Sequence, residues 1–177
     1  MSAPRIFALA FALVFTAFSV CRAHTSHTES HPVHLDGVDA DRVDWRSKTT
    51  DYWREVLSPR RFRVCRSGGT ERAFSGKYDR FYEAGIYKCS SCGLPLFSSE
   101  HKYNSRTGWP SFWRPIREGA VAYKEDRSFG MLRTEIVCAR CGAHLGHVFN
   151  DGPRPTGKRY CVNSVCLFHE REKKRGF

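Results

Sequence analysis

Two Cys-x-x-Cys pairs constrain this chain more than any other feature of its sequence. Cys89 and Cys92 form the first pair, and Cys138 and Cys141 form the second. Four thiolates in two such turns match the ligand set of a tetrahedral structural Zn²⁺, because each turn lets two sulfur atoms reach one ion at about 2.3 Å. The sequence therefore predicts a closed zinc site that contributes to the fold and leaves catalysis to other residues.

A glycine directly follows each pair, at Gly93 and Gly142. Glycine takes a positive φ at no steric cost, which suits the end of a metal-binding turn. Two structural disulfides, or a thioredoxin-like redox pair, are the alternatives. A redox motif would not occur in duplicate with matching glycines, so we favour zinc.

The first 23 residues have the pattern of an export signal. Residues 2–5 give a short basic start, residues 6–20 are almost wholly apolar, and a small-residue stretch ends at Ala23. The apolar run is short for a membrane span. We therefore predict cleavage after Ala23 and export to the periplasm, the secretory pathway or the medium, without stable membrane insertion. Lipid attachment at Cys21 and an uncleaved anchor are the alternatives.

The remaining residues suffice for one domain with a proper core, and we expect a monomer. Residues 24–48 are rich in histidine and polar side chains, which predicts a flexible linker. The predicted domain covers residues 49–170, and residues 171–177 form a basic tail.

The net charge of +11 is compatible with nucleic-acid binding, with an acidic partner surface or with solubility alone. The basic residues are scattered, with no stripe of Lys and Arg interleaved with aromatic residues. We therefore expect no nucleic-acid partner. A zinc-ribbon binding module and an exported structural zinc domain are the alternatives to an enzyme.

The local patterns predict a mainly β domain of antiparallel strands with short helices at its front. A helix is expected over residues 50–57, with Pro59 ending it. Alternating or β-rich runs over residues 62–65, 131–137 and 159–168 predict strands, and Gly, Pro and Asn mark the turns between them.

Three segments outside the cysteine pairs carry candidate chemistry. On a strand, Cys161 and Asn163 share one face, which places a thiol and an amide donor together, next to a basic residue. His144 and His147 follow the second cysteine pair and could protonate a leaving oxygen near neutral pH. Trp109 lies in a rigid Gly-Trp-Pro turn and could wall an apolar pocket. Core packing is the alternative for each.

The motifs Cys-x-x-Cys, GWPSF, Cys-x-x-Cys, HLGHVFNDGP and RYCVNS, in this order, resemble the methionine sulfoxide reductase B family over roughly residues 50–168. The resemblance implies a zinc-bearing fold of two antiparallel β-sheets in a barrel-like or tent-like arrangement. It implies reduction of the R epimer of methionine sulfoxide, free or in proteins, as repair after oxidative stress. The implied partners are oxidised proteins and thioredoxin or a similar dithiol reductant.

Carried over by position, the resemblance implies specific roles. Cys161 is the nucleophile, Asn163 with His144 and His147 binds or protonates the sulfoxide oxygen, and Trp109 packs on the methyl group. Arg159 would help to keep the thiolate, and Phe149 would contact the substrate. Attack by Cys161 leaves a sulfenic acid, which a second thiol converts to a disulfide.

The second thiol is the point at which the chain departs from many family members, since Thr107 stands where they carry the resolving cysteine. In a continuous strand Cys166 would lie about 16 Å from Cys161, too far for a disulfide. Cys65 lies between Arg63 and Arg66 on the polar side of its expected strand, which favours exposure and thiolate character. Some family members have an N-terminal resolving thiol, so a redox-active Cys65–Cys161 disulfide is expected.

Overall fold

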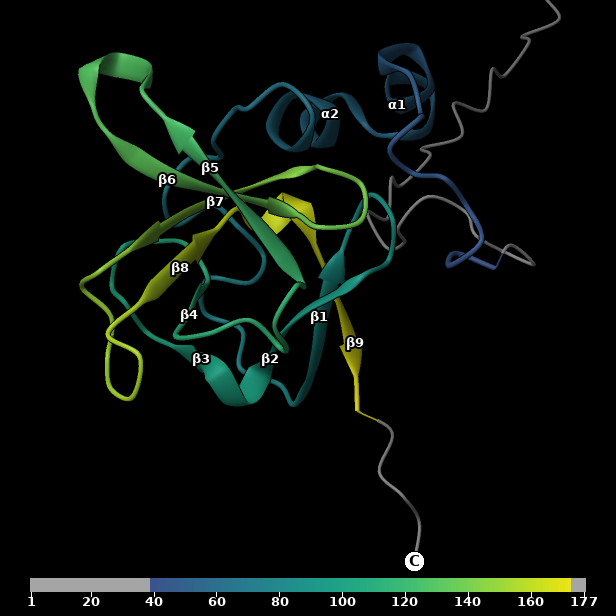
Figure 1. Ribbon diagram of the computed structural model, residues 1–177. Coiled ribbons are helices and arrows are strands. Elements are labelled where there is room, and N and C mark those ends of the chain that lie inside the picture. The colour runs from purple at the N-terminus through teal and green to yellow at the C-terminus, as the bar shows by residue number, and fades with distance from the viewer. Residues whose placement is uncertain (1–38, 173–177) are drawn as a thin grey trace, which may run out of the picture.

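Two antiparallel β-sheets, with two short helices on the N-terminal side, make up the computed structural model, which describes residues 39–172 (Figure 1). The predicted leader and most of the predicted linker lie outside these residues. Within the described range, no helix has the length and apolarity needed to cross a bilayer. The expected mainly β class with antiparallel sheets is confirmed.

The larger sheet has the strand order β3-β4-β8-β7-β6-β5, so β3 and β5 are its edges. The smaller sheet has the order β2-β1-β9. Three 3₁₀ turns, η1, η2 and η3, interrupt the strands and redirect the chain. The strands are β1 Gly85–Cys89, β2 Pro95–Ser98, β3 Lys102–Tyr103, β4 Ser111–Phe112, β5 Val121–Asp126, β6 Arg133–Cys138, β7 His144–Phe149, β8 Arg159–Val162 and β9 Leu167–Arg171, and the turns are η1 Ser99–His101, η2 Ser128–Gly130 and η3 Ser164–Cys166.

Aromatic side chains from both sheets form the centre of the core. Phe97 of β2 stacks on Phe112 of β4 with ring centroids 4.4 Å apart, and Tyr87 of β1 meets Phe112 edge-on at 5.1 Å. All three side chains are fully buried. Such pairs add to the hydrophobic free energy of burial, so they fix the two sheets against each other.

The helices are α1 Thr50–Val56 and α2 Pro59–Cys65. The predicted first helix is confirmed, but Pro59 begins a second helix instead of only ending the first. The prediction of a strand over residues 62–65 is therefore wrong. Ser58 caps α2 by accepting from Arg61 N, and proline suits the first helical position because its missing N–H has no partner there. These start signals outweigh an alternation only four residues long.

Residues 159–168 do not form one strand. β8 belongs to the larger sheet, η3 turns the chain, and β9 joins the smaller sheet. The estimate that placed Cys166 by counting along a continuous strand is therefore wrong. The turn brings Cys166 onto α2, where its Cα lies 5.6 Å from that of Cys65 and the two form a disulfide.

This disulfide corrects the predicted exposure and pairing of Cys65. The residue is completely buried on the inner face of α2, so the expectation of an exposed thiolate on a strand is wrong. Its sulfur is bonded to Cys166, and the expected Cys65–Cys161 disulfide is not the pairing in the structure. Residues this far apart in sequence meet only through the packing of α2 on η3.

The folded region starts earlier than predicted. Trp45 is buried and stacks on Trp53 of α1 with ring centroids 6.1 Å apart, and Arg46 donates to the carbonyl of Ala139 at 2.6 Å. The last part of the predicted linker is therefore packed on the domain. At the other end, Arg171 belongs to β9 and pairs with Glu83, so it is not part of a tail.

Replacing both disulfide cysteines by alanine should destabilise the domain, because the crosslink closes a loop of 101 residues and restricts the unfolded chain. We expect a loss of about 2–4 kcal/mol in denaturant unfolding. The control is Cys161→Ser, which removes a thiol outside this pair and should leave stability nearly unchanged. A doubly substituted protein as stable as the wild type would contradict the assignment.

Candidate active site and cysteine cluster

The four cysteines of the two Cys-x-x-Cys pairs converge on one point. Their Sγ atoms lie within 4.8 Å of one another, and all four residues are buried. The Sγ atoms of Cys89 and Cys141 are 3.7 Å apart, and those of Cys92 and Cys138 are 3.6 Å apart. Two sulfurs bound at 2.3 Å to a tetrahedral ion would be about 3.8 Å apart. The donor set and its spacing therefore fit one metal ion.

Each cysteine turn has the geometry that the glycines predicted. Gly93 N donates to Cys89 O at 2.8 Å, and Gly142 N donates to Cys138 O at 2.9 Å. The two glycines have φ values of 76° and 71°. Cys89 ends β1 of the smaller sheet and Cys138 ends β6 of the larger one, so the cluster connects the two sheets.

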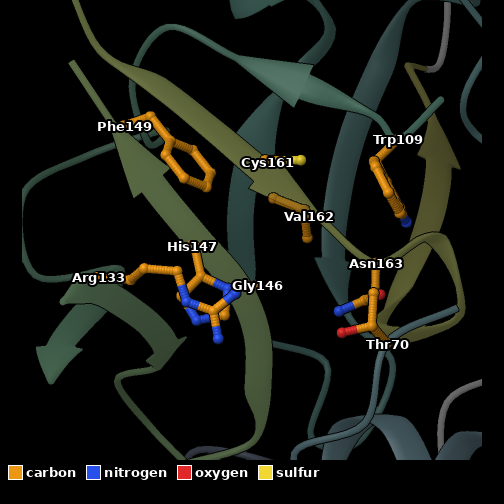
Figure 2. A pocket seen from close by; sticks show the side chains of 9 residues that line it. All are labelled: Thr70, Trp109, Arg133, Gly146, His147, Phe149, Cys161, Val162 and Asn163. Atoms are coloured by element: carbon orange, nitrogen blue, oxygen red, sulfur yellow. The ribbon is translucent and has the colours of Figure 1, made fainter. Parts of the chain in front are cut away.

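A cavity of about 140 Å³ opens above the larger sheet around Cys161 (Figure 2). Figure 2 shows Trp109 on one side of Cys161 and Phe149 on the other, with His147 below. The cavity thus combines a thiol, an imidazole and two aromatic walls. Its lining residues are Thr70, Trp109, Arg133, Gly146, His147, Phe149, Cys161, Val162 and Asn163.

Cys161 lies on β8 and is partly exposed in the cavity. In the sheet register it stands opposite His147 of β7, so the two side chains are neighbours on one face. Burial raises the pKa of the Cys161 thiol, whereas the Arg159 charge and a hydrogen bond with Thr107 lower it. Burial has the larger effect, so the pKa of Cys161 is raised, and Arg159 and Thr107 offset only part of this rise.

Arg159 is held beside the thiol by an ion pair. Its Nε and Nη2 atoms donate to the two carboxylate oxygens of Asp151, each at 2.8 Å. Its guanidinium also lies over the ring of Phe149, 4.3 Å from the centroid. A planar cation fixed in two ways keeps its charge at one place, and that charge lowers the pKa of Cys161 in opposition to burial.

The two histidines occupy different environments. His147 lines the cavity and its Nε2 lies 2.7 Å from Oδ2 of Asp126. His144 is buried with its Nδ1 2.7 Å from Oε1 of Glu135, and it does not line the cavity. Burial lowers the pKa of His147, and the bond to Asp126 raises it. Of the predicted pair, only His147 reaches the cavity that holds Cys161.

Asn163 and Trp109 are both tied to Glu71. Glu71 N donates to Oδ1 of Asn163 at 3.0 Å, and Nε1 of Trp109 donates to the Glu71 carbonyl at 3.1 Å. Nδ2 of Asn163 donates to the carbonyl of Leu145 at 3.1 Å. The amide is thus oriented from both ends, with one N–H of its NH₂ group left for a ligand.

Sequence reasoning missed several residues that define the site. Glu71 lies in irregular chain, and the partners of the histidines lie on β5 and β6, which only strand pairing brings to β7. A signal for Asp151 existed, because it belongs to the HLGHVFNDGP motif. The missed residues are Thr70, Glu71, Asp126, Arg133, Glu135 and Asp151.

Residues 57–171 match the family model described as the SelR domain. The chain is also similar to three bacterial proteins named "Peptide methionine sulfoxide reductase MsrB". The protein of Pseudomonas putida strain KT2440 is 58% identical over 120 residues, which are 68% of this chain and 92% of that protein.

The relative from Pseudomonas syringae pv. syringae strain B728a is 56% identical over 125 residues, covering 71% of this chain and 95% of its own. That from Azotobacter vinelandii strain DJ is 54% identical over 125 residues, covering 71% and 94%. A domain match over most of the described chain, together with these identities, shows that the protein belongs to the SelR-domain family of methionine sulfoxide reductases B.

Proposed function

We propose that this protein reduces methionine sulfoxide, free or within oxidised proteins, to methionine, with Cys161 as the nucleophile. The observation that carries the proposal is the single cavity in which a partly exposed thiol faces an imidazole between two aromatic walls. The names of the similar proteins support the same reaction. Repair of oxidised proteins is the function that follows from this chemistry.

In the proposed reaction the Cys161 thiolate attacks the sulfoxide sulfur while a proton reaches the sulfoxide oxygen. Attack joins Cys161 to the substrate sulfur; the oxygen then moves to Cys161 as this sulfur–sulfur bond and the sulfur–oxygen bond of the substrate break, so Cys161 becomes a sulfenic acid and methionine leaves as a thioether. Thiolate, sulfoxide and one proton thus become sulfenic acid and thioether. His147 supplies the proton, because it is the histidine that shares the cavity with Cys161.

The remaining cavity residues orient the substrate. Trp109 and Phe149 offer apolar surface to the methyl and methylene groups beside the sulfur, and the free N–H of Asn163 can donate to the sulfoxide oxygen. Preference for the R epimer is part of the proposal and rests on the family resemblance. His144, buried on Glu135, acts through the packing of its ring against His147.

Regeneration of Cys161 is proposed to use an external thiol directly. Among residues 39–172 the free cysteines are Cys161 and the four of the cluster, and Cys65 and Cys166 are joined to each other. Thr107, which bonds to Cys161, has no thiol. A dithiol such as thioredoxin would attack the sulfenic acid, release water and then resolve its own mixed disulfide.

The metal of the cysteine cluster is proposed to be Zn²⁺, held by Cys89, Cys92, Cys138 and Cys141. A closed thiolate set suits zinc, and its role here is to hold the ends of β1 and β6 together. Export through residues 1–23 is proposed as well. An oxidising compartment would also favour the Cys65–Cys166 disulfide.

Cys161→Ser should abolish reduction of a methionine-R-sulfoxide peptide in a single turnover, because a serine hydroxyl is a far weaker nucleophile than a thiolate. The wild type should release about one methionine per enzyme from the R epimer and much less from the S epimer. Acid-quenched chromatography of the products measures both. Turnover by the serine variant would refute the nucleophile, and equal use of both epimers would refute the stereochemistry.

Without reductant, one turnover should leave a sulfenic acid on Cys161 that dimedone labels, since no free thiol outside the cluster is described near it. Peptide mapping should find Cys65–Cys166 both before and after turnover. In protein that still carries residues 1–23, Cys21→Ser is the control for a thiol from the leader and should give the same labelling. A Cys161 disulfide within the chain would contradict the proposed route.

Metal analysis should find close to one zinc per chain, and removal by a strong chelator should unfold the domain, because binding energy and folding energy are linked in such sites. Circular dichroism during chelation measures the loss of secondary structure. Cys89→Ser should lose both zinc and stability, whereas Cys161→Ser should keep both. A metal-free protein that stays folded would overturn the structural role.

A further inference from the structure

Asp126 is the carboxylate that faces the proposed proton donor, and nothing in the sequence motifs points to it. It is the last residue of β5, at the edge of the larger sheet. His147 lies on β7, with β6 between the two strands. The 2.7 Å contact between Asp126 Oδ2 and His147 Nε2 therefore spans one strand and depends on the twist and register of three.

The carboxylate of Asp126 is itself held in place by other donors. Arg133 Nη2 lies 2.7 Å from Oδ2, and the backbone N–H of Ser128 donates to Oδ1 at 2.9 Å. The side chains of Asp126 and His147 are only 18% and 14% exposed. Hydrogen bonds from Ser128 and His147, and the charge of Arg133, lower the pKa of Asp126, so it stays ionised.

An ionised carboxylate can only accept hydrogen bonds, so the Nε2 atom of His147 must carry a hydrogen. In neutral His147 the other nitrogen, Nδ1, is then without a proton. Nδ1 is therefore the atom at which the ring gains and loses its proton. This arrangement resembles the carboxylate that orients a histidine in hydrolase triads, where the acid fixes the tautomer and stabilises the charged ring.

We propose that Asp126 is a positioning residue of the reductase reaction, which fixes His147 as the Nε2–H tautomer and stabilises the imidazolium that delivers a proton from Nδ1 to the sulfoxide oxygen. The inference rests on the proposed function and adds the residue that orients His147, the proposed proton donor. The charged and titratable groups near His147 are Asp126 of β5, Arg133 and Glu135 of β6, His144 of β7 and Cys161 of β8.

These neighbours shift the pKa of His147 in opposite directions, so the inference predicts the direction in which this pKa moves when Asp126 loses its charge. Burial, Arg133 and His144 lower the pKa of His147, and Asp126 raises it. Without the Asp126 charge the imidazolium is lost at lower pH. At acidic pH His147 is protonated with or without Asp126, so the chemical step should then be equally fast. Toward neutral and alkaline pH the rate without the Asp126 charge should be lower than that of the wild type.

The test is Asp126→Asn, which keeps the shape and an accepting oxygen but removes the charge. We expect the NMR titration of the His147 ring to move down by about one pH unit, because an adjacent opposite charge shifts a pKa by at least that much. Single-turnover rates should match the wild type below the titration of His147 and be about tenfold lower above it. Circular dichroism verifies the fold of each variant.

Glu125→Gln is the matched control, since it removes a carboxylate from the adjacent residue on the exposed, opposite face of β5. It should change neither the titration nor the pH profile. If Asp126→Asn fails to fold, Arg133→Gln replaces it in the NMR measurement, and the His147 titration should then move up because a neighbouring positive charge is lost.

An unchanged His147 titration, or a rate loss of the same factor at every pH, would overturn the inference. The titration does not require turnover. A protein that shows the shift but reduces no sulfoxide would therefore refute the proposed function and leave the Asp126–His147 coupling in place.

Discussion

The pairing of β7 with β8 is the constraint on which the site depends. It sets His147 opposite Cys161, and it requires the two backbones to approach closely at Gly146. A Cβ at that position would lie 2.0 Å from the carbonyl oxygen of Cys161, closer than any real contact. Any larger residue would push the strands apart and separate the thiol from the imidazole.

A second layer of contacts holds the far side of the cavity. Glu71 is buried, and its carboxylate accepts from the backbone N–H groups of Ser164 and Val165, the latter at 3.2 Å. Burial raises the pKa of Glu71 and these donors lower it. The backbone of the same residue positions Asn163 and Trp109. The Cys65–Cys166 disulfide then fastens η3 to α2 just behind this layer.

Three carboxylates contact the charged and titratable side chains of the candidate site. Asp151 holds Arg159 beside the thiol, Asp126 faces His147, and Glu135 holds His144. In each case the acid lies on a different segment from the residue it orients. The positions of the Cys161 thiol and the His147 imidazole therefore depend on the strand register and on the loops that bring these acids to them.

Much of the fold and the centre of the site could be predicted from local sequence. Each cysteine turn shows its ligand spacing and its glycine within a few residues, and Cys161 and Asn163 lie two residues apart. These groups could therefore be predicted from local sequence with little tertiary information. The errors arose where a short pattern had two meanings. Four alternating residues at 62–65 suited a strand, but the Ser58 cap and Pro59 made them a helix.

The sequence by itself determined the four-cysteine cluster, the choice of Cys161 as the candidate nucleophile and the family, because these depend on residue type at short, fixed spacing. Only the tertiary structure decided the partner of Cys65 and the different environments of His144 and His147. It alone also decided the contact of Asp126 with His147 and those of Glu71 with Asn163 and Trp109. Those contacts join residues distant in the chain. Strand order, the turn at η3 and the packing of α2 determine these contacts, and a local sequence pattern cannot predict such long-range distances.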